Sequence, residues 1–521
     1  MAEASSLADK RCAFIDLLRV STVALICVAG TSLPRALADP AAAGSTAGMP
    51  AFAPGMIGHM QAMRRFKDND HGVQTAPTII PRFGLDEDPS GAVATFQTGA
   101  TIPANNAFFQ NLGTNGRTCF TCHQPQSGWT VSAADVADRF ATSRGTDPIF
   151  RLVDGATCPS NDVSNLPAKR RAYALLIDKG LIRIGLPMPS QPQFEVTAVD
   201  DPYGCNTNAA TGLTSPSAGI VSIYRRPLPA TNLGFLSAIM WDGREPSLAS
   251  QAKDATLGHA QANPNPGPTD AQIAEIVAFE SGIFTAQEID QPAGILHRDG
   301  ALGGPIALSL QLSKFFIGVN DPLGQNPSGA PFDRNIFDLY RPWLSARGGQ
   351  EDEVERRLSI ARGEEVFNTT PINISGVTGL NDVLKQSSIS GFCGTCHDTP
   401  NVGNHSVKAP LDIGVADAGG KIPPVLDLSG LPVFTLTCTQ GDFAGQTFTV
   451  TDPGRALITG NCADIGKLKG PILRGLAARA PYFHNGSAAT LTDVVEFYDQ
   501  RFGIGFTAQQ KSDLVNFLNA L

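Results

Sequence analysis

The sequence has few aromatic side chains, no basic cluster and, beyond its first 38 residues, no long apolar run. Aromatic residues make up only 7% of its 521 residues, so each Trp and Tyr marks a position of interest. The formal net charge is -9 and no Arg-rich arm is present, which argues against nucleic acid as a partner. A membrane-spanning helix needs about 20 apolar residues, so we expect no membrane span in the mature chain, which should be soluble.

Residues 1–38 have the composition of an export signal. Lys10, Arg11 and Arg19 supply positive charge, and the apolar stretch at 20–34 is short for a membrane span. The sequence Ala-Leu-Ala at 36–38 provides a small-x-small cleavage site. We therefore expect a signal peptide over 1–38 and a periplasmic or secreted protein; an uncleaved membrane anchor is the alternative.

Cysteine is scarce, with ten in the chain, yet the spacing of four of them is repeated. The two C-x-x-C-H motifs are Cys119, Cys122 and His123, and Cys393, Cys396 and His397. A redox-active dithiol needs alternating strands and helices around the motif, which the sequence does not indicate. A zinc site made of all four cysteines would leave both histidines unexplained.

Covalent attachment of haem c accounts for every position of both motifs. The two thiols of a motif add to the vinyl groups of one haem, and the histidine that follows binds the iron. We therefore predict two covalent haem c groups, tethered by the four motif cysteines, with His123 and His397 as proximal iron ligands.

Four further cysteines remain outside the motifs and the predicted signal peptide. They fall into two pairs that are close in sequence, and exported proteins use such pairs as disulfides. We predict the disulfides Cys158–Cys205 and Cys438–Cys462, with unpaired buried thiols as the alternative.

The segments around the motifs predict helices. A Phe-bearing segment, expected to be helical, precedes each motif, and before the second motif Val354, Leu358 and Ala361 recur at helical spacing. Thr507 and Gln510 form a capping box for a helix that closes the chain. We therefore expect a mostly α-helical fold with two cytochrome c-like haem domains, long loop insertions and a few short β-hairpins.

The expected organisation has four parts. They are a signal peptide at 1–38, an N-terminal extension at 39–100, a catalytic haem 1 domain at 101–347 and an electron-transfer haem 2 domain at 348–521.

Two further segments carry a family resemblance. Residues 471–500, PILRGLAARAPYFHNGSAATLTDVVEFYDQ, and residues 232–252, NLGFLSAIMWDGREPSLASQA, resemble the di-haem cytochrome c peroxidase superfamily, which includes MauG and the haem rubber oxygenases. The resemblance covers these segments and both haem motifs. It implies that the N-terminal haem is the reactive one. It also implies that Trp241 relays electrons between the haems and that Gln251 lines the reactive pocket; a core tryptophan is the alternative for Trp241.

The sequence departs from the family at three points. Peroxidases carry an acidic residue twenty positions after the Trp, whereas this chain has Gln261, which cannot act as a general acid or base. His259 is close enough in sequence to take that role. Arg226 stands where the family's calcium site uses Asn, which argues against calcium. No histidine lies between His123 and His259, so haem 1 should be open on its distal side.

The sixth ligand of haem 2 has two candidates. The family places Met or Tyr fourteen residues after the histidine of P-Y-F-H, and this chain has Tyr498 there. His484 is the competing ligand, and a core tyrosine is the alternative for Tyr498.

Together these patterns indicate an exported di-haem oxidoreductase of cytochrome c peroxidase or MauG type. It should activate peroxide or dioxygen at haem 1, with electrons relayed through Trp241 and haem 2, and its expected partner is an electron-donor or acceptor redox protein. Motifs alone leave peroxidase, protein-oxidising and oxygenase variants open. A di-haem electron-transfer cytochrome without a substrate is the second hypothesis.

Overall fold

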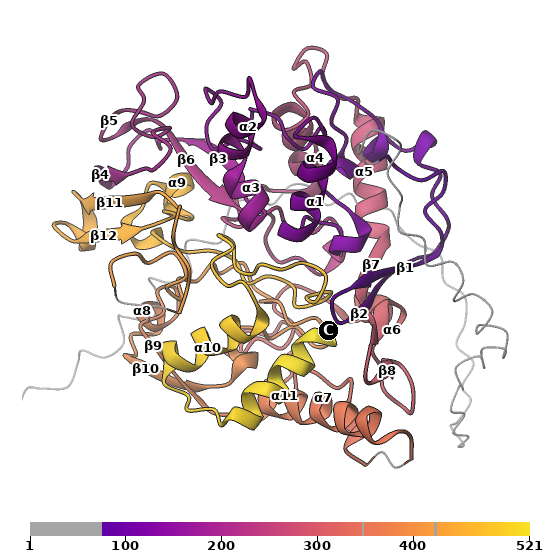
Figure 1. The fold of residues 1–521 in the computed structure, drawn as a ribbon. Helices are drawn as coiled ribbons and strands as arrows, with labels where there is room; N and C mark the ends of the chain where they lie inside the picture. The colour runs from indigo at the N-terminus through magenta and orange to yellow at the C-terminus, as the bar shows by residue number, and fades with distance from the viewer. Residues whose placement is uncertain (1–74, 346–347, 421–424) are drawn as a thin grey trace, which may run out of the picture. The chain divides into compact units, whose positions relative to one another are not determined.

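The computed structural model describes residues 75–345, 348–420 and 425–521 (Figure 1). The predicted signal peptide, residues 39–74 of the predicted extension and the last two residues of the predicted haem 1 domain lie outside the described residues. All described residues belong to one compact unit, which spans 62–521. The border between two haem domains stays a prediction.

The fold is not mostly α-helical, contrary to the prediction, because 32% of it is helical and 18% lies in strands. The strands lie in the predicted N-terminal extension, at 83–97, and in both predicted haem domains, so they amount to more than the few short hairpins expected. Strand β7 (Ile283–Asp290) illustrates the physical reason, since seven of its eight residues are buried. A strand that is buried on both faces lacks the alternation of polar and apolar residues that identifies a strand in a sequence.

The largest sheet has four antiparallel strands in the order β1-β2-β7-β8. β1 (Phe83–Asp88) and β2 (Gly91–Gln97) form a hairpin, β2 pairs with β7, and β7 pairs with the short β8 (Gly294–Ile295). The Trp129 side chain donates from Nε1 to Oγ1 of Thr95 on β2 at 2.8 Å. This contact attaches the loop that follows the first C-x-x-C-H motif to the sheet.

Three smaller sheets are also antiparallel. Their strands, in spatial order, are β3 (Ile182–Pro187), β6 (Ala218–Arg225) and β5 (Leu213–Ser215); β12 (Thr447–Val450), β11 (Val433–Cys438) and β4 (Phe194–Asp200); and β10 (Ser388–Gly391) and β9 (Ile372–Ser375). Because β4 precedes the W-D-G-R segment and β11 follows the second motif, their pairing connects the two halves of the sequence.

Among the described residues, the cysteines outside the motifs lie in the two pairs that the sequence predicts. One disulfide joins Cys158 to Cys205, 47 residues apart, and the other joins Cys438 to Cys462, 24 residues apart. All four residues are buried, so both bridges lie within packed parts of the fold.

The α-helices of the described residues are distributed along the whole chain. They are α1 (Ala133–Ser143), α2 (Leu166–Ala172), α3 (Ala174–Lys179), α4 (Leu248–Gly258), α5 (Asp270–Gly282), α6 (Gly304–Gln311), α7 (Glu351–Thr369), α8 (Asn381–Leu384), α9 (Ala456–Thr459), α10 (Leu491–Phe502) and α11 (Ala508–Asn519).

Two of these helices confirm predictions made from the sequence. Helix α7 covers the segment before the second motif in which Val354, Leu358 and Ala361 recur, and α11 begins after Thr507, which forms the predicted capping box with Gln510. The two helices lie side by side (Figure 1). They pack closely at Gly363, where an added Cβ atom would clash with the carbonyl oxygen of Asp513.

The Phe-bearing segment before the first motif is not α-helical. It forms two 3-10 turns, Pro103–Asn105 and Ala107–Phe109. Asn106 separates them in an extended conformation, and its side chain accepts a hydrogen bond from the backbone N–H of Phe108. Such a local bond competes with continuation of a helix.

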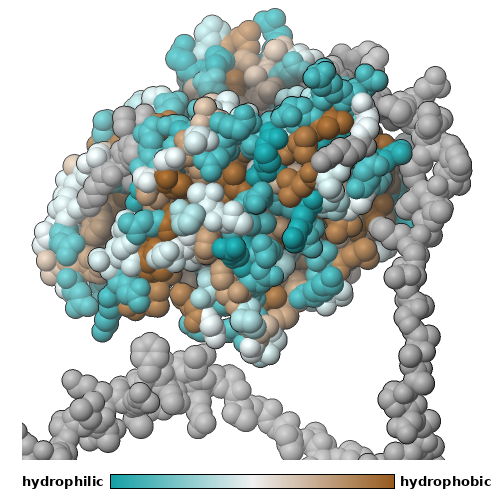
Figure 2. Space-filling model, turned by 90° about the horizontal axis from the view of Figure 1, so that it is seen from below, coloured by the Kyte–Doolittle hydropathy of each residue, from teal (hydrophilic) through white to brown (hydrophobic). Residues whose placement is uncertain are grey.

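The surface mixes residue types. The face shown in Figure 2 carries hydrophobic and hydrophilic residues side by side. Among the described residues, the helices are too short or too polar to traverse a bilayer.

Candidate functional site

Both C-x-x-C-H motifs fold in the same way. The first begins with the 3-10 turn Cys119–Thr121 and the second with the turn Cys393–Thr395. In each motif the backbone N–H of the histidine donates to the carbonyl of the first cysteine at 3.1 Å. The turn therefore brings the histidine back beside the first cysteine, so that two thiols and one imidazole can face a single ligand.

The two motif histidines are held in matching orientations. Nδ1 of His123 donates to the carbonyl of Trp129 at 2.8 Å, and Nδ1 of His397 donates to that of Gly403 at 2.6 Å. Burial lowers the pKa of both imidazoles to about 4, so both rings are neutral near pH 7. A neutral ring that donates through Nδ1 offers Nε2 as a metal ligand.

The four motif cysteines are free thiols. Burial raises the pKa of Cys393 and Cys396 to about 12 and also raises the pKa of Cys119 and Cys122. In the ranges 75–345, 348–420 and 425–521, no three His, Cys, Asp or Glu side chains form a group that could hold a metal ion, which leaves a zinc site without support.

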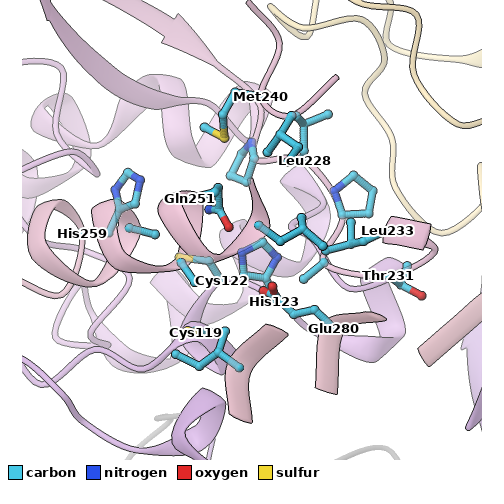
Figure 3. A pocket seen from close by; sticks show the side chains of 18 of the residues that line it. Cys119, Cys122, His123, Leu228, Thr231, Leu233, Met240, Gln251, His259 and Glu280 are labelled. Atoms are coloured by element: carbon cyan, nitrogen blue, oxygen red, sulfur yellow. The ribbon is translucent and has the colours of Figure 1, made fainter. Parts of the chain in front are cut away.

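The first motif opens onto a pocket that is shown in Figure 3. Helix α4 lines this pocket with Gln251 and Ala255, and His259 follows at the C-cap of the helix. Residues four apart lie on one face of an α-helix, which is why these three positions reach the same pocket. The structure thus brings Gln251 and His259 together beside the first motif, and their catalytic roles stay predictions.

His259 is held by a buried carboxylate. Its Nδ1 lies 2.5 Å from Oδ2 of Asp154, and Arg117 binds the other carboxylate oxygen. Burial by itself would raise the pKa of Asp154, but the positive charge of Arg117 and the hydrogen bond from His259 outweigh burial and lower it. The carboxylate fixes the ring through Nδ1, and Nε2 makes no hydrogen bond with the described residues. Asp154 was not identified from the sequence because it lies 105 residues from His259.

Gln261 does not line this pocket. Its side chain is exposed, and its Oε1 accepts a hydrogen bond of 3.3 Å from Asn115. Its backbone is left-handed, with a φ of 56°, directly after the end of α4. His259 therefore lines the pocket, whereas Gln261, at the position where the family has an acidic residue, does not.

Glu280, near the end of α5, is a pocket residue that sequence reasoning missed. It is 5% exposed, lines the first pocket and has no hydrogen-bond partner for Oε2. Burial raises its pKa to about 8, so the side chain is protonated near pH 7. An orphaned buried carboxyl in a pocket wall indicates that a ligand completes the site. A lone Glu in the apolar stretch at 276–284 was the available signal.

The second motif opens onto another pocket, which both candidate ligands of haem 2 line. Tyr498 stacks on Phe502 with ring centroids 6.3 Å apart, and burial raises the pKa of its phenol. Burial lowers the pKa of His484 to about 4, and its Nε2, 3.6 Å from a carboxylate oxygen of Asp452, has no hydrogen-bond partner. Both groups are neutral and available beside the pocket, and the choice between them stays a prediction.

Trp241 lies in the wall that the two pockets share. It lines both pockets, and its Nε1 donates to the carbonyl of Arg226 at 2.9 Å. Its ring centroid is 6.1 Å from that of His484. The structure therefore places an indole ring between the two pockets.

The loops that carry Trp241 and His484 repeat each other. An isolated β-bridge closes residues 239–245 in one loop and 482–488 in the other. The residue before the Trp or the His has a left-handed backbone in both, with φ of 67° and 63°. Helices α4 and α10 follow the two loops at the same distance. The two pockets are thus built by one local structure that is used twice.

This repeat also shows where the pockets differ. Counted from Trp241 and His484, Ala255 on α4 corresponds to Tyr498 on α10, and Gln251 corresponds to Val494. The first pocket therefore has a methyl group where the second has a phenol.

The residues present fit two haem c groups. Each pocket combines two free thiols with a neutral imidazole whose Nε2 is available. The first pocket also contains the orphaned Glu280 carboxyl, which a bound ligand can complete.

Comparison with known proteins agrees with this reading, although no model of a protein family matches the chain. The chain is 40% identical to cytochrome-c peroxidase IdrP1 of Pseudomonas sp. strain SCT over 315 residues, which are 57% of this chain and 68% of the relative. It is 28% identical to cytochrome c551 peroxidase of Nitrosomonas europaea over 184 residues, which are 33% of this chain and 46% of that protein. A solved structure of a MauG-like protein associated with microbial copper homeostasis aligns with a TM-score of 0.35 and 16% identity, covering 80% of this chain and 86% of that one.

The match to IdrP1 extends over more than two thirds of that peroxidase at 40% identity. Together with the paired haem motifs, it shows that the chain belongs to the di-haem cytochrome c peroxidase superfamily and is a peroxidase-like oxidoreductase that uses haem c.

Proposed function

We propose that the protein is exported, carries two covalent haem c groups and reduces peroxide with electrons from a redox protein. The names of the peroxidase relatives support this reaction. The two pairs of free thiols, each beside an available imidazole, support two attached haems. The reaction consumes two electrons and two protons for each peroxide and yields two molecules of water.

The assignment of peroxide to one pocket rests on the difference between the two repeated pockets. Tyr498 occupies the second pocket, whereas Ala255 leaves the equivalent position of the first pocket free. Only the first pocket also holds His259. We therefore assign peroxide to the first pocket and electron entry to the second.

The side chains of the first pocket transfer the proton of the peroxide substrate. When bound, haem supplies an iron that binds peroxide and accepts electrons. Nε2 of His259 takes the proton from one peroxide oxygen and returns it to the departing oxygen, which is the work of a general acid–base group. Asp154 keeps the ring in place and stabilises the imidazolium while it holds the proton. Gln251 can donate a hydrogen bond to the substrate but cannot relay a proton.

Trp241 is assigned the electron relay between the pockets. Its position in their shared wall supports this role, as does its contact with His484. Substitution of Trp241 by Phe should slow electron delivery to the first haem and leave peroxide binding unchanged.

The test measures haem content and spin state. A pyridine haemochrome assay should find two covalent haems in each chain, and electron paramagnetic resonance should find one high-spin and one low-spin ferric haem. Peroxide should alter the high-spin signal first. One haem, or haem that acidified solvent extracts, refutes the attachment, and two low-spin haems that ignore peroxide support the electron-transfer cytochrome instead. Sequencing the mature N-terminus, expected at Asp39, tests export.

A further inference from the structure

Two buried cations lie where the two pockets meet. Arg226 is 6% exposed, Lys469 is 7% exposed, and each lines both pockets. The backbone N–H of Arg226 donates to the carbonyl of His484 at 2.7 Å, and that of Lys469 donates to the carbonyl of Trp241 at 2.8 Å. Because Trp241 and His484 hold equivalent places in the repeated loops, Arg226 and Lys469 are equivalent as well.

Neither cation has an acidic partner among the described residues. The guanidinium of Arg226 donates only to backbone carbonyls, those of Val131 at 2.6 Å, Arg479 at 2.9 Å and Lys179 at 3.2 Å. In the part of the chain that the structure describes, no hydrogen bond or ion pair holds the ammonium of Lys469. Burial lowers the pKa of Arg226 to about 9 and that of Lys469 to about 7.

Arg474 and Arg479 are two further pocket cations without an acidic partner among the described residues. Arg474 lines the first pocket, Arg479 lines both, and their guanidinium groups also donate to backbone carbonyls. In contrast, the buried Arg117, Arg139 and Arg225 each form an ion pair with an aspartate. Arg474 is buried and Arg479 is half-buried. A buried charge without a partner is costly, so these four cations indicate anions that come from outside the polypeptide.

We infer that Arg226 and Lys469, together with Arg474 and Arg479, bind the propionate carboxylates of both haems and couple the two cofactors electrostatically. This inference rests on the proposed function. Each haem carries two propionates, so two haems bring as many carboxylates as there are cations in the cluster. Guanidinium and ammonium groups form strong charge-assisted hydrogen bonds with carboxylates. Because Arg226 and Lys469 line both pockets, each of them acts on both haems.

The test compares two lysines of the same segment. Lys469→Met removes one cation of the cluster. Lys467→Met is the matched control, because Lys467 is 8% exposed, lies 3.3 Å from a carboxylate oxygen of Asp464 and lines neither pocket. Covalent haem is counted by pyridine haemochrome in the full-length holoprotein, and the reduction potentials of both haems are measured by spectroelectrochemical titration.

Loss of a nearby positive charge favours the oxidised haem. In Lys469→Met we expect at least a tenfold fall in the reduction equilibrium constant of both haems, which is about 59 mV for a one-electron couple. Lys467→Met should leave both potentials unchanged, and Lys469→Arg should restore them.

Several results would overturn the inference. They are unchanged potentials in Lys469→Met at full haem content, a shift confined to one haem, or an equal shift in Lys467→Met. Lys469→Met could also lower the covalent haem content. In that case Lys469→Arg must restore the haem content and Lys467→Met must leave it normal. Failure of either requirement also overturns the inference. An unmodified protein without two covalent haems refutes the proposed function instead.

Discussion

Replacement of His259 by Ala tests the catalytic assignment most directly. A positioned acid–base group contributes about 10²–10⁴ in rate, which corresponds to roughly 3–5 kcal/mol of activation free energy. His259 is the pocket residue that meets this description, since a buried carboxylate binds its Nδ1 at 2.5 Å and its Nε2 remains free. The second-order rate constant of the first haem with peroxide should therefore fall by about 10²–10⁴-fold.

The same substitution should have a smaller effect on folding. The His259 side chain is 39% exposed, so little core packing is lost. Asp154 loses one partner but keeps Arg117, which limits the cost in unfolding free energy to about 1–3 kcal/mol. A thermal melt of the variant separates this cost from the catalytic effect.

Stopped-flow absorbance of the Soret band measures the rate constant. Asp154→Asn should give a rate between those of His259→Ala and the unmodified protein, because the ring keeps a hydrogen-bonding neighbour but loses its charged one. Gln261→Ala is the control, since Gln261 is exposed outside the pocket. A His259→Ala variant that reacts at the unmodified rate, or a Gln261→Ala variant that is equally slow, would refute the assignment.

Three further predictions concern the second haem, the first pocket and the buried ion pairs. Tyr498→Phe should change the absorption spectrum of the second haem if the phenol is its sixth ligand; a change seen only in His484→Ala assigns the histidine instead. Burial raises the pKa of Glu280 from 4.5 to about 8, so its stabilising effect is complete below about pH 4.5 and is lost as the pH rises through about 8. Glu280→Gln should therefore remove a fall in melting temperature between about pH 4.5 and 8, and an unchanged fall would contradict this. Arg225→Met leaves two buried aspartates without their shared cation and should cost about 3–5 kcal/mol in urea unfolding; a loss below about 1 kcal/mol would place the pair among weak surface bridges.

Sequence alone determined the features that depend on short spacings. The two C-x-x-C-H motifs specify their own turns, because the bond from the histidine N–H to the first cysteine carbonyl closes within five residues. Helix α11 was equally predictable, since Thr507 and Gln510 cap it locally. The two cysteine pairs followed from an even count and short separations.

The strand content could not be read in the same way. Strand β7 is buried on both faces and follows α5 directly, so its mixture of buried apolar and polar residues has neither the period of a half-buried strand nor a turn before it. Strands β4 and β11 pair although more than two hundred residues separate them in the sequence. A local sequence pattern cannot predict which distant strand a given strand will pair with.

Tertiary structure alone decided which ionisable groups act together. The family spacing pointed to Gln261, but His259 continues the face of α4 that lines the pocket, and Asp154 from a distant segment binds it. In the sequence Arg226 argued only against calcium and Lys469 had no distinguishing context, and only the fold shows that both are buried between the pockets without an acidic neighbour among the described residues. The physical reason is that a charge is compensated by whatever lies within a few ångströms of it, and those neighbours are set by packing rather than by spacing along the chain.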